Sequence, residues 1–164
     1  MSSPRIALLP ETDVVSDIAS GGSMQRILVP VDATGRAADA VALARMSCAV
    51  NGTVRLVHVR IFDPPVRNFG RFFPESRDDA AAVVEGALLA AWAWVSKATG
   101  DVVIAERSRV AQAIVTAARN WDSGVIVMAR RPRRAVTRLL TGSVADAVLR
   151  RATCPVLVTR PGLR

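Results

Sequence analysis

A junction between an apolar strand and a helix, near the C-terminus of the chain, is the clearest candidate for chemistry. The stretch "MARRPRRAVTRLLTGSVADAV" runs from Met128 to Val148, and Gly142-Ser143 lies at the opening turn of the expected helix. Backbone N–H groups at a helix start hold anions, and glycine lets the backbone approach them closely. The connecting loop carries arginines and a proline in place of further glycines. This pattern indicates an anion site of altered construction.

The loop arginines have two interpretations. Those around the expected phosphate position are Arg130, Arg131, Arg133, Arg134 and Arg138. Guanidinium groups form charge-assisted hydrogen bonds to phosphate, so they can replace missing backbone amides. A charge-rich loop can equally stay in water, because ordering long side chains costs rotamer entropy. Both interpretations remain open from the sequence.

Composition limits the other kinds of chemistry. The chain has 164 residues, 51% of them hydrophobic, which is typical of one globular domain. Cys48 and Cys154 are far apart, which favours buried thiols over a metal or redox pair. His58 is the only histidine and alternates with Val54 and Leu56 along a strand, so we interpret it as a packed structural residue. No catalytic residue and no metal site are expected.

Charge and hydropathy give a first indication of partners and location. Residues 107–164 hold 12 of the 22 basic residues, but only Asp122 and Asp146 of the 14 acidic ones. This basic surface keeps a nucleic-acid-binding protein open as an alternative, although no aromatic residue interrupts "RRPRR". The apolar run from Ala87 to Val95 is about half of a membrane span, and the start lacks an apolar signal region. We expect a cytoplasmic protein without membrane contact.

The elements that position the junction alternate between strand and helix. Expected strands cover residues 26–31, 53–61, 101–106, 124–129 and 155–159. We expect the first helix to stop at Asn51-Gly52, Asp78 or Asp79 to cap the second, and Ser108 to cap the third. A long loop should run from Phe62 to Arg77. Residues 1–24 should form a flexible leader and residues 25–164 the domain.

Strands that are continuous Val, Ile and Leu runs, each followed by a helix, indicate a doubly wound parallel sheet with helices on both faces. Ligands of such sheets bind at the carboxyl ends of the strands, where the winding reverses. The strand order does not follow from these patterns alone.

Three segments together resemble the universal stress protein family. They are "ILVPVDAT", "LVHV" and "VIVMARRPRRAVTRLLTGSVADAVLRRATCPVLV", and the similarity covers Gln25 to Arg160. The resemblance implies five parallel strands in the order 3-2-1-4-5, a fold of the adenine nucleotide alpha hydrolase type. It also implies a homodimer through the last strand, Pro155 to Thr159, whose short apolar edge invites pairing.

The resemblance further implies an ATP site with a loop of the form G-x-x-G, nine residues, then G-[ST]. Here Ala129 and Pro132 replace the first two glycines, while Gly142 and Ser143 are present. Proline has no N–H to offer a phosphate, so a weakened site is expected. Magnesium is expected only together with ATP. The implied site residues are Pro30, Val31, Asp32, Val59, Met128, Ala129, Arg131, Gly142, Ser143 and Val144.

Within this set, Asp32 would accept hydrogen bonds from the ribose hydroxyls. An equally weighted alternative is that Asp32 is a turn or cap residue after the first strand. The resulting hypothesis is a stress-response binding or regulatory module with an altered adenine-nucleotide site, at most a slow ATPase. The alternatives are a basic nucleic-acid-binding protein and a structural dimer without ligand.

Overall fold

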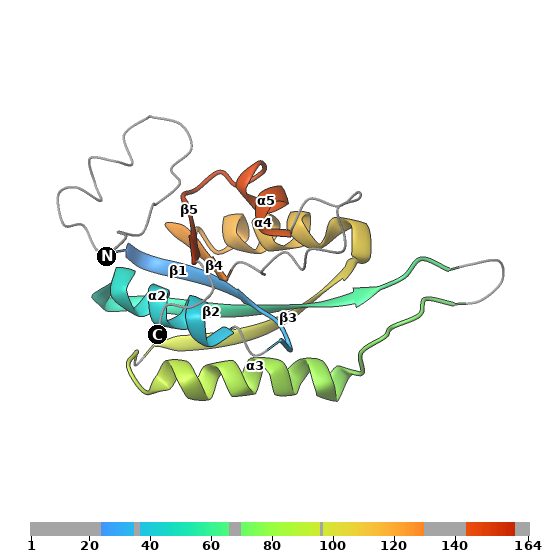
Figure 1. Cartoon of the computed structure of the whole chain (residues 1–164), viewed down its shortest axis with the longest axis horizontal. Coiled ribbons are helices and arrows are strands. Elements are labelled where there is room, and N and C mark those ends of the chain that lie inside the picture. The colour runs from blue at the N-terminus through green and yellow to red at the C-terminus, as the bar shows by residue number, and fades with distance from the viewer. Residues whose placement is uncertain (1–23, 35–36, 66–69, 96, 130–143, 160–164) are drawn as a thin grey trace, which may run out of the picture.

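Strands and helices alternate along the chain (Figure 1). The computed structural model describes residues 24–34, 37–65, 70–95, 97–129 and 144–159. The strands are β1 Met24–Val31, β2 Cys48–Phe62, β3 Ala98–Glu106, β4 Val125–Ala129 and β5 Val156–Thr159. The helices are α2 Ala37–Ser47, α3 Arg77–Trp92, α4 Val110–Asn120 and α5 Val144–Leu149, with a 3-10 turn, η1 Arg107–Arg109, before α4.

The five strands form one parallel sheet in the order β3-β2-β1-β4-β5. This confirms the doubly wound sheet and the order 3-2-1-4-5. Helix α3 lies on one side of the sheet and α4 and α5 on the other (Figure 1). In the described ranges, no helix combines the length and the apolar character needed to cross a membrane.

Two apolar layers form because successive strand residues point to opposite faces of the sheet. On β1, Ile27 and Val29 pack with α2 and α3, whereas Leu28 packs with α4 and α5. On β4, Val127 and Met128 divide in the same way. Burial on both faces explains why these strands are continuous apolar runs in the sequence.

The first helix is shorter than expected. Helix α2 ends at Ser47 and β2 begins at Cys48, so the predicted helix stop at Asn51-Gly52 is wrong. Cys48 pairs with Met24 of β1, and regular pairing continues after a register shift. Residues whose apolar spacing is typical of a helix are therefore part of a strand. Tertiary context outweighs weak local propensity here.

The caps of the next two helices also differ from the predictions. Ser76, not Asp78 or Asp79, is the N-cap of α3. The backbone N–H of Asp79 donates to Ser76 Oγ at 3.0 Å, so Asp79 serves as the third residue of a capping box. Ser108 donates its hydroxyl to Glu106 Oε1 at 2.6 Å, and α4 has no side-chain cap.

The end of β2 and the segment before α3 extend away from the body of the sheet (Figure 1). The backbone N–H of Asp63 donates to the carbonyl oxygen of Phe72 at 2.9 Å. Arg107 donates to both carboxylate oxygens of Asp63, at 2.8 and 3.0 Å. These hydrogen bonds lower the pKa of Asp63. The pair ties the extension to η1 at the end of β3.

Candidate functional site

The winding of the sheet reverses between β1 and β4. These strands are neighbours, while β2 and β3 follow on one side and β5 on the other. Ligand sites of open α/β sheets lie at the carboxyl ends of the strands beside such a reversal. Val31 ends β1 and Ala129 ends β4, so the carboxyl ends of these two neighbouring parallel strands lie at the same edge of the sheet.

Several predicted site residues lie at this edge, and others lie in the core. Pro30, Val31, Asp32 and Ala129 are at or directly after the ends of β1 and β4. Val59 and Met128 are buried in the apolar layer beneath α4 and α5, and their contact with a ligand stays a prediction. Their side chains act as core residues.

The remaining predicted residues belong to the loop after β4. Val144 is the exposed first residue of α5. Arg131, Gly142 and Ser143 lie outside the described residues, as do Pro132 and the other loop arginines. The prediction for this loop stays a prediction.

Asp32 forms a turn at the end of β1. Its Oδ1 accepts the backbone N–H of Thr34 at 3.0 Å and also the Thr34 hydroxyl. Such an Asx turn lets an aspartate redirect the chain as it leaves a strand. The turn role considered for Asp32 is therefore present, and Asp32 also lines a cavity beside it.

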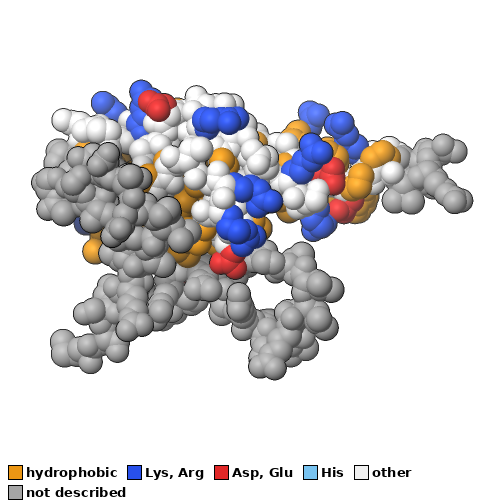
Figure 2. Space-filling model, turned by 90° about the horizontal axis from the view of Figure 1, so that it is seen from above, with side chains coloured by type: hydrophobic (Ala, Val, Ile, Leu, Met, Phe, Trp, Pro, Cys, Tyr) orange, Lys and Arg blue, Asp and Glu red, His pale blue; other side chains and the backbone are white. Residues whose placement is uncertain are grey.

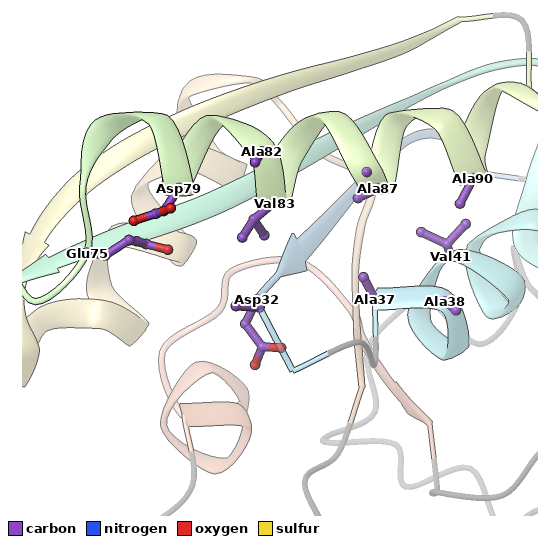
Figure 3. A pocket seen from close by; sticks show the side chains of 12 residues that line it. Asp32, Ala37, Ala38, Val41, Glu75, Asp79, Ala82, Val83, Ala87 and Ala90 are labelled. Carbon is purple, nitrogen blue, oxygen red and sulfur yellow. The ribbon is translucent and has the colours of Figure 1, made fainter.

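This cavity has a volume of about 640 Å³ and lies between α2 and α3 (Figure 3). Its carboxylates belong to Asp32, Glu75 and Asp79. Asp32 lies across the cavity from the two carboxylates at the start of α3 (Figure 3). The other lining residues are small or apolar: Ala33, Ala37, Ala38, Val41, Ala82, Val83, Gly86, Ala87 and Ala90. Short side chains on both helices leave this space open.

His58 is buried next to the cavity, with 6% of its surface exposed. Its Nδ1 lies 2.9 Å from the carbonyl oxygen of Val31, and its Nε2 lies 2.8 Å from Oε2 of Glu75. Both ring nitrogens are therefore engaged. The histidine links the end of β1 to the segment that precedes α3.

Arg60 holds the same segment two residues further along β2. Its Nε donates to the carbonyl oxygen of Glu75 at 3.0 Å. Its guanidinium carbon lies 4.1 Å from the centre of the Phe73 ring, a cation–π geometry. Arg60 and His58 together fix Glu75 from its backbone and from its side chain.

Sequence reasoning missed Glu75 and Asp79 as cavity residues. A signal existed for Asp79, because Ser76 and Asp79 have the spacing of a capping box. Glu75 stands in a segment without periodicity, so only the fold brings it to His58.

Potential metal-ligating side chains do not gather into a cluster in the part of the chain that the structure describes. Within the described ranges, no group of three or more His, Cys, Asp and Glu side chains could hold a metal ion. Cys48 and Cys154 are unpaired thiols, and burial raises the pKa of both.

Basic side chains are visible on the face that carries α4 and α5 (Figure 2). A groove of about 390 Å³ between the start of α4 and the end of α5 is lined by Arg109, Arg150 and Arg151. Arg151 donates to the carbonyl oxygen of Ala147 at 3.2 Å. The basic surface expected from the C-terminal third thus includes a groove on the opposite face from the cavity.

Comparison with known proteins gives consistent matches over most of the chain. The universal stress protein family model matches residues 24–160. A Thermus aquaticus protein described as "Universal stress protein in QAH/OAS sulfhydrylase 3'region" is 31% identical over 135 residues, 82% of this chain and 97% of that protein.

Solved structures of similar fold carry the same family description. A universal stress protein of Archaeoglobus fulgidus has a TM-score of 0.61 at 22% identity, covering 87% of this chain and 98% of that one. A universal stress protein in complex with cAMP has a TM-score of 0.65 at 20% identity, covering 85% and 99%. The A. fulgidus protein in complex with dAMP has a TM-score of 0.62 at 22% identity, covering 82% and 96%.

The solved structures share the fold, and the match to the family model runs from the first residue of β1 to residue 160. The chain belongs to the universal stress protein family.

Proposed function

We propose that this chain is a cytoplasmic stress-response binding module that takes an adenine nucleotide at the carboxyl edge of its sheet. One observation carries the proposal: the Asp32 turn, at the point where the winding reverses, faces a cavity of about 640 Å³. Two relatives of the same fold have structures in complex with cAMP and dAMP.

The residues around the cavity favour one orientation of the nucleotide. Apolar alanine and valine side chains suit the faces of an adenine ring, and the Asp32 carboxylate suits ribose hydroxyls. Asp32, Glu75 and Asp79 would repel phosphates. The phosphates would therefore point away from the cavity, toward the loop that follows β4, and magnesium would enter only with ATP.

Binding, not rapid catalysis, is the proposed activity. The only histidine of the chain is His58, and both its ring nitrogens are already hydrogen-bonded. A histidine that acts as a general base needs a free ring nitrogen within reach of the proton it removes. ATP turnover by purified protein should stay well below about 1 per second, the low end of typical enzymes. Faster turnover would contradict this assignment.

Two measurements test the nucleotide proposal. Mass spectrometry of gently purified protein, after denaturation, should detect a released adenine nucleotide. Calorimetry with AMP and ATP should give an affinity that Asp32→Ala lowers about tenfold or more, the loss expected for a charge-assisted hydrogen bond. Asp78→Ala is the matched control, because Asp78 is an exposed carboxylate outside the cavity.

Absence of binding by the wild-type protein, in both measurements, would leave the structural dimer as the favoured alternative. In that case nucleotide should not change the melting temperature.

Nucleic-acid binding is a second candidate, favoured by the groove with Arg109, Arg150 and Arg151. It predicts phosphate-dominated affinity that falls steeply as salt rises. Gel-shift titrations with duplex and single-stranded DNA at two salt concentrations test it. An Arg109→Gln/Arg150→Gln variant that binds as well as wild type would argue against it.

We also propose a homodimer through β5, which is an edge strand of the sheet formed by the described residues. Its segment Pro155 to Thr159 is short and apolar, and an unpaired edge of this kind invites pairing with a second chain.

A further inference from the structure

The His58 side chain spans the gap between β1 and the start of α3. Val31, its partner on β1, is also its register partner in the parallel pairing of β1 with β2. The ring therefore bonds to the carbonyl of the residue beside it in the sheet, at the last position of β1. Beyond this position the chain leaves the sheet in the Asp32 turn.

The two hydrogen bonds define the protonation of the ring. A carbonyl oxygen only accepts, so Nδ1 of His58 donates to Val31 at 2.9 Å. An ionised carboxylate also only accepts, so Nε2 donates to Glu75 at 2.8 Å. A neutral imidazole has one N–H and an imidazolium has two. The contacts together fit an imidazolium paired with the Glu75 carboxylate.

Several charged groups lie around the ring. Glu75 and Asp79 from the α3 side and Asp32 from the end of β1 line the same cavity. The guanidinium next to Glu75 belongs to Arg60, which donates a hydrogen bond to the backbone carbonyl oxygen of Glu75.

The hydrogen bond to Val31 matters for the shape of the site. A buried carbonyl without a donor costs free energy comparable to a lost hydrogen bond. His58 supplies a donor where β1 ends and the turn begins. One residue later, Asp32 accepts the N–H of Thr34 at 3.0 Å and lines the cavity.

We infer that His58 is a positioning residue for the nucleotide cleft. Its imidazolium, held by Glu75, fixes the Val31 carbonyl and so the direction in which Asp32 enters the cavity. The inference adds a positioning residue to the proposed nucleotide site. Its affinity measurement rests on the proposed function. The protonation of the ring and the order of the turn are measured without ligand.

Nuclear magnetic resonance of the ring tests the first step. The chain contains one histidine, so protein with isotope-labelled histidine gives ring-nitrogen signals from His58 alone. Both ring nitrogens of the wild type should carry a proton, because each faces an oxygen that accepts a hydrogen bond. In Glu75→Gln, which keeps the shape and removes the charge, the amide donates to Nε2 and the ring keeps its proton on Nδ1 only. A wild-type ring with one unprotonated nitrogen, or a ring that Glu75→Gln leaves unchanged, overturns the inference.

The second step is tested with AMP as the probe. His58→Leu, which removes the donor to the Val31 carbonyl and leaves the cavity carboxylates in place, should lower AMP affinity about tenfold, the scale of one lost hydrogen bond that orders the site. Asp78→Asn is the matched control, since it removes an exposed carboxylate from the first turn of α3 outside the cavity. It should bind AMP as the wild type does. Equal AMP affinity of wild type and His58→Leu overturns the positioning role.

The two proposals fail in different ways. If the wild-type protein bound no AMP, the proposed function would be wrong. The positioning role of His58 would then be tested by the backbone amide signals of the Asp32 turn in protein without ligand. The Ala33 and Thr34 signals should move in His58→Leu, which removes the hydrogen bond to Val31, and stay in place in Asp78→Asn. Signals that stay at their wild-type positions in both variants overturn it.

Discussion

Gly100 of β3 lies against Val84 of α3 with no room for a side-chain atom between them. A Cβ built on Gly100 would overlap Cγ1 of Val84 and lie 3.0 Å from Cδ1 of Leu88. Val84 is buried, with 6% of its surface exposed, so it has little space to move. The absent side chain sets how closely the helix approaches the sheet.

Gly100→Ala should therefore destabilise the protein, although alanine suits a strand no worse than glycine. Overpacking at a closed contact costs about 1–3 kcal/mol of unfolding free energy. Urea unfolding followed by circular dichroism measures the difference.

The matched control is Gly86→Ala in α3, where an added Cβ meets nothing within 4 Å. Alanine in a helix interior should raise the unfolding free energy by about 0.5–1 kcal/mol. If the two alanine variants shifted stability in the same direction, close packing at Gly100 would not be the cause.

The thiols of Cys48 and Cys154 should react slowly in the folded protein. Burial raises the pKa of both, so a smaller fraction is thiolate at neutral pH, and the thiolate is the reactive form. Alkylation should be about threefold or more slower than in urea-unfolded protein and should speed up as pH rises. Mass spectrometry of iodoacetamide adducts over time gives the rates, and equal folded and unfolded rates would refute the explanation.

The proposed homodimer makes a prediction for the two edges of the sheet. Val158→Lys in β5 places a charge at the pairing edge and should weaken the dimer about tenfold or more, since charges on edge strands oppose pairing. Val102→Lys in β3, the other edge strand, is the control and should leave the dimer intact. Light scattering across micromolar concentrations distinguishes them, and a wild-type monomer throughout this range would rule out the dimer.

Substitutions in the loop after β4 should change the affinity for ATP. Ala129→Gly combined with Pro132→Gly should raise ATP affinity, because it restores an N–H and permits close approach of the backbone. Neutralising Arg131 and Arg133 should lower the ATP affinity. A loss of about tenfold is expected if these side chains contribute charge-assisted hydrogen bonds to phosphate. Calorimetry on both variants separates the two interpretations of the arginines. No change in either variant would mean that the loop does not touch phosphate.

Much of the fold follows from local patterns. Continuous apolar runs such as Val125–Ala129 indicated buried parallel strands, because only a strand covered on both faces is apolar at every position. Asp32, directly after such a run, indicated both a turn and a ligand contact, and the structure shows that turn beside a cavity. The strand order came from family resemblance, since hydrophobic runs do not say which strands are neighbours.

Element ends were less predictable. The segment from Cys48 to Gly52 has residues compatible with a helix end, yet it belongs to β2, and Cys48 pairs with Met24 of β1. Local propensity is worth a fraction of a kcal/mol per residue, so a few sheet hydrogen bonds outweigh it.

The sequence by itself determined the class of fold and the identity of the family, and it singled out Asp32 at the end of β1. Only the tertiary structure decided which side chains meet there. Glu75 reaches His58 across 17 residues because α3 packs on β2 and β3, and Gly100 permits that packing. A contact of this kind depends on how a helix packs against a sheet. The types of the two residues in contact do not determine that packing.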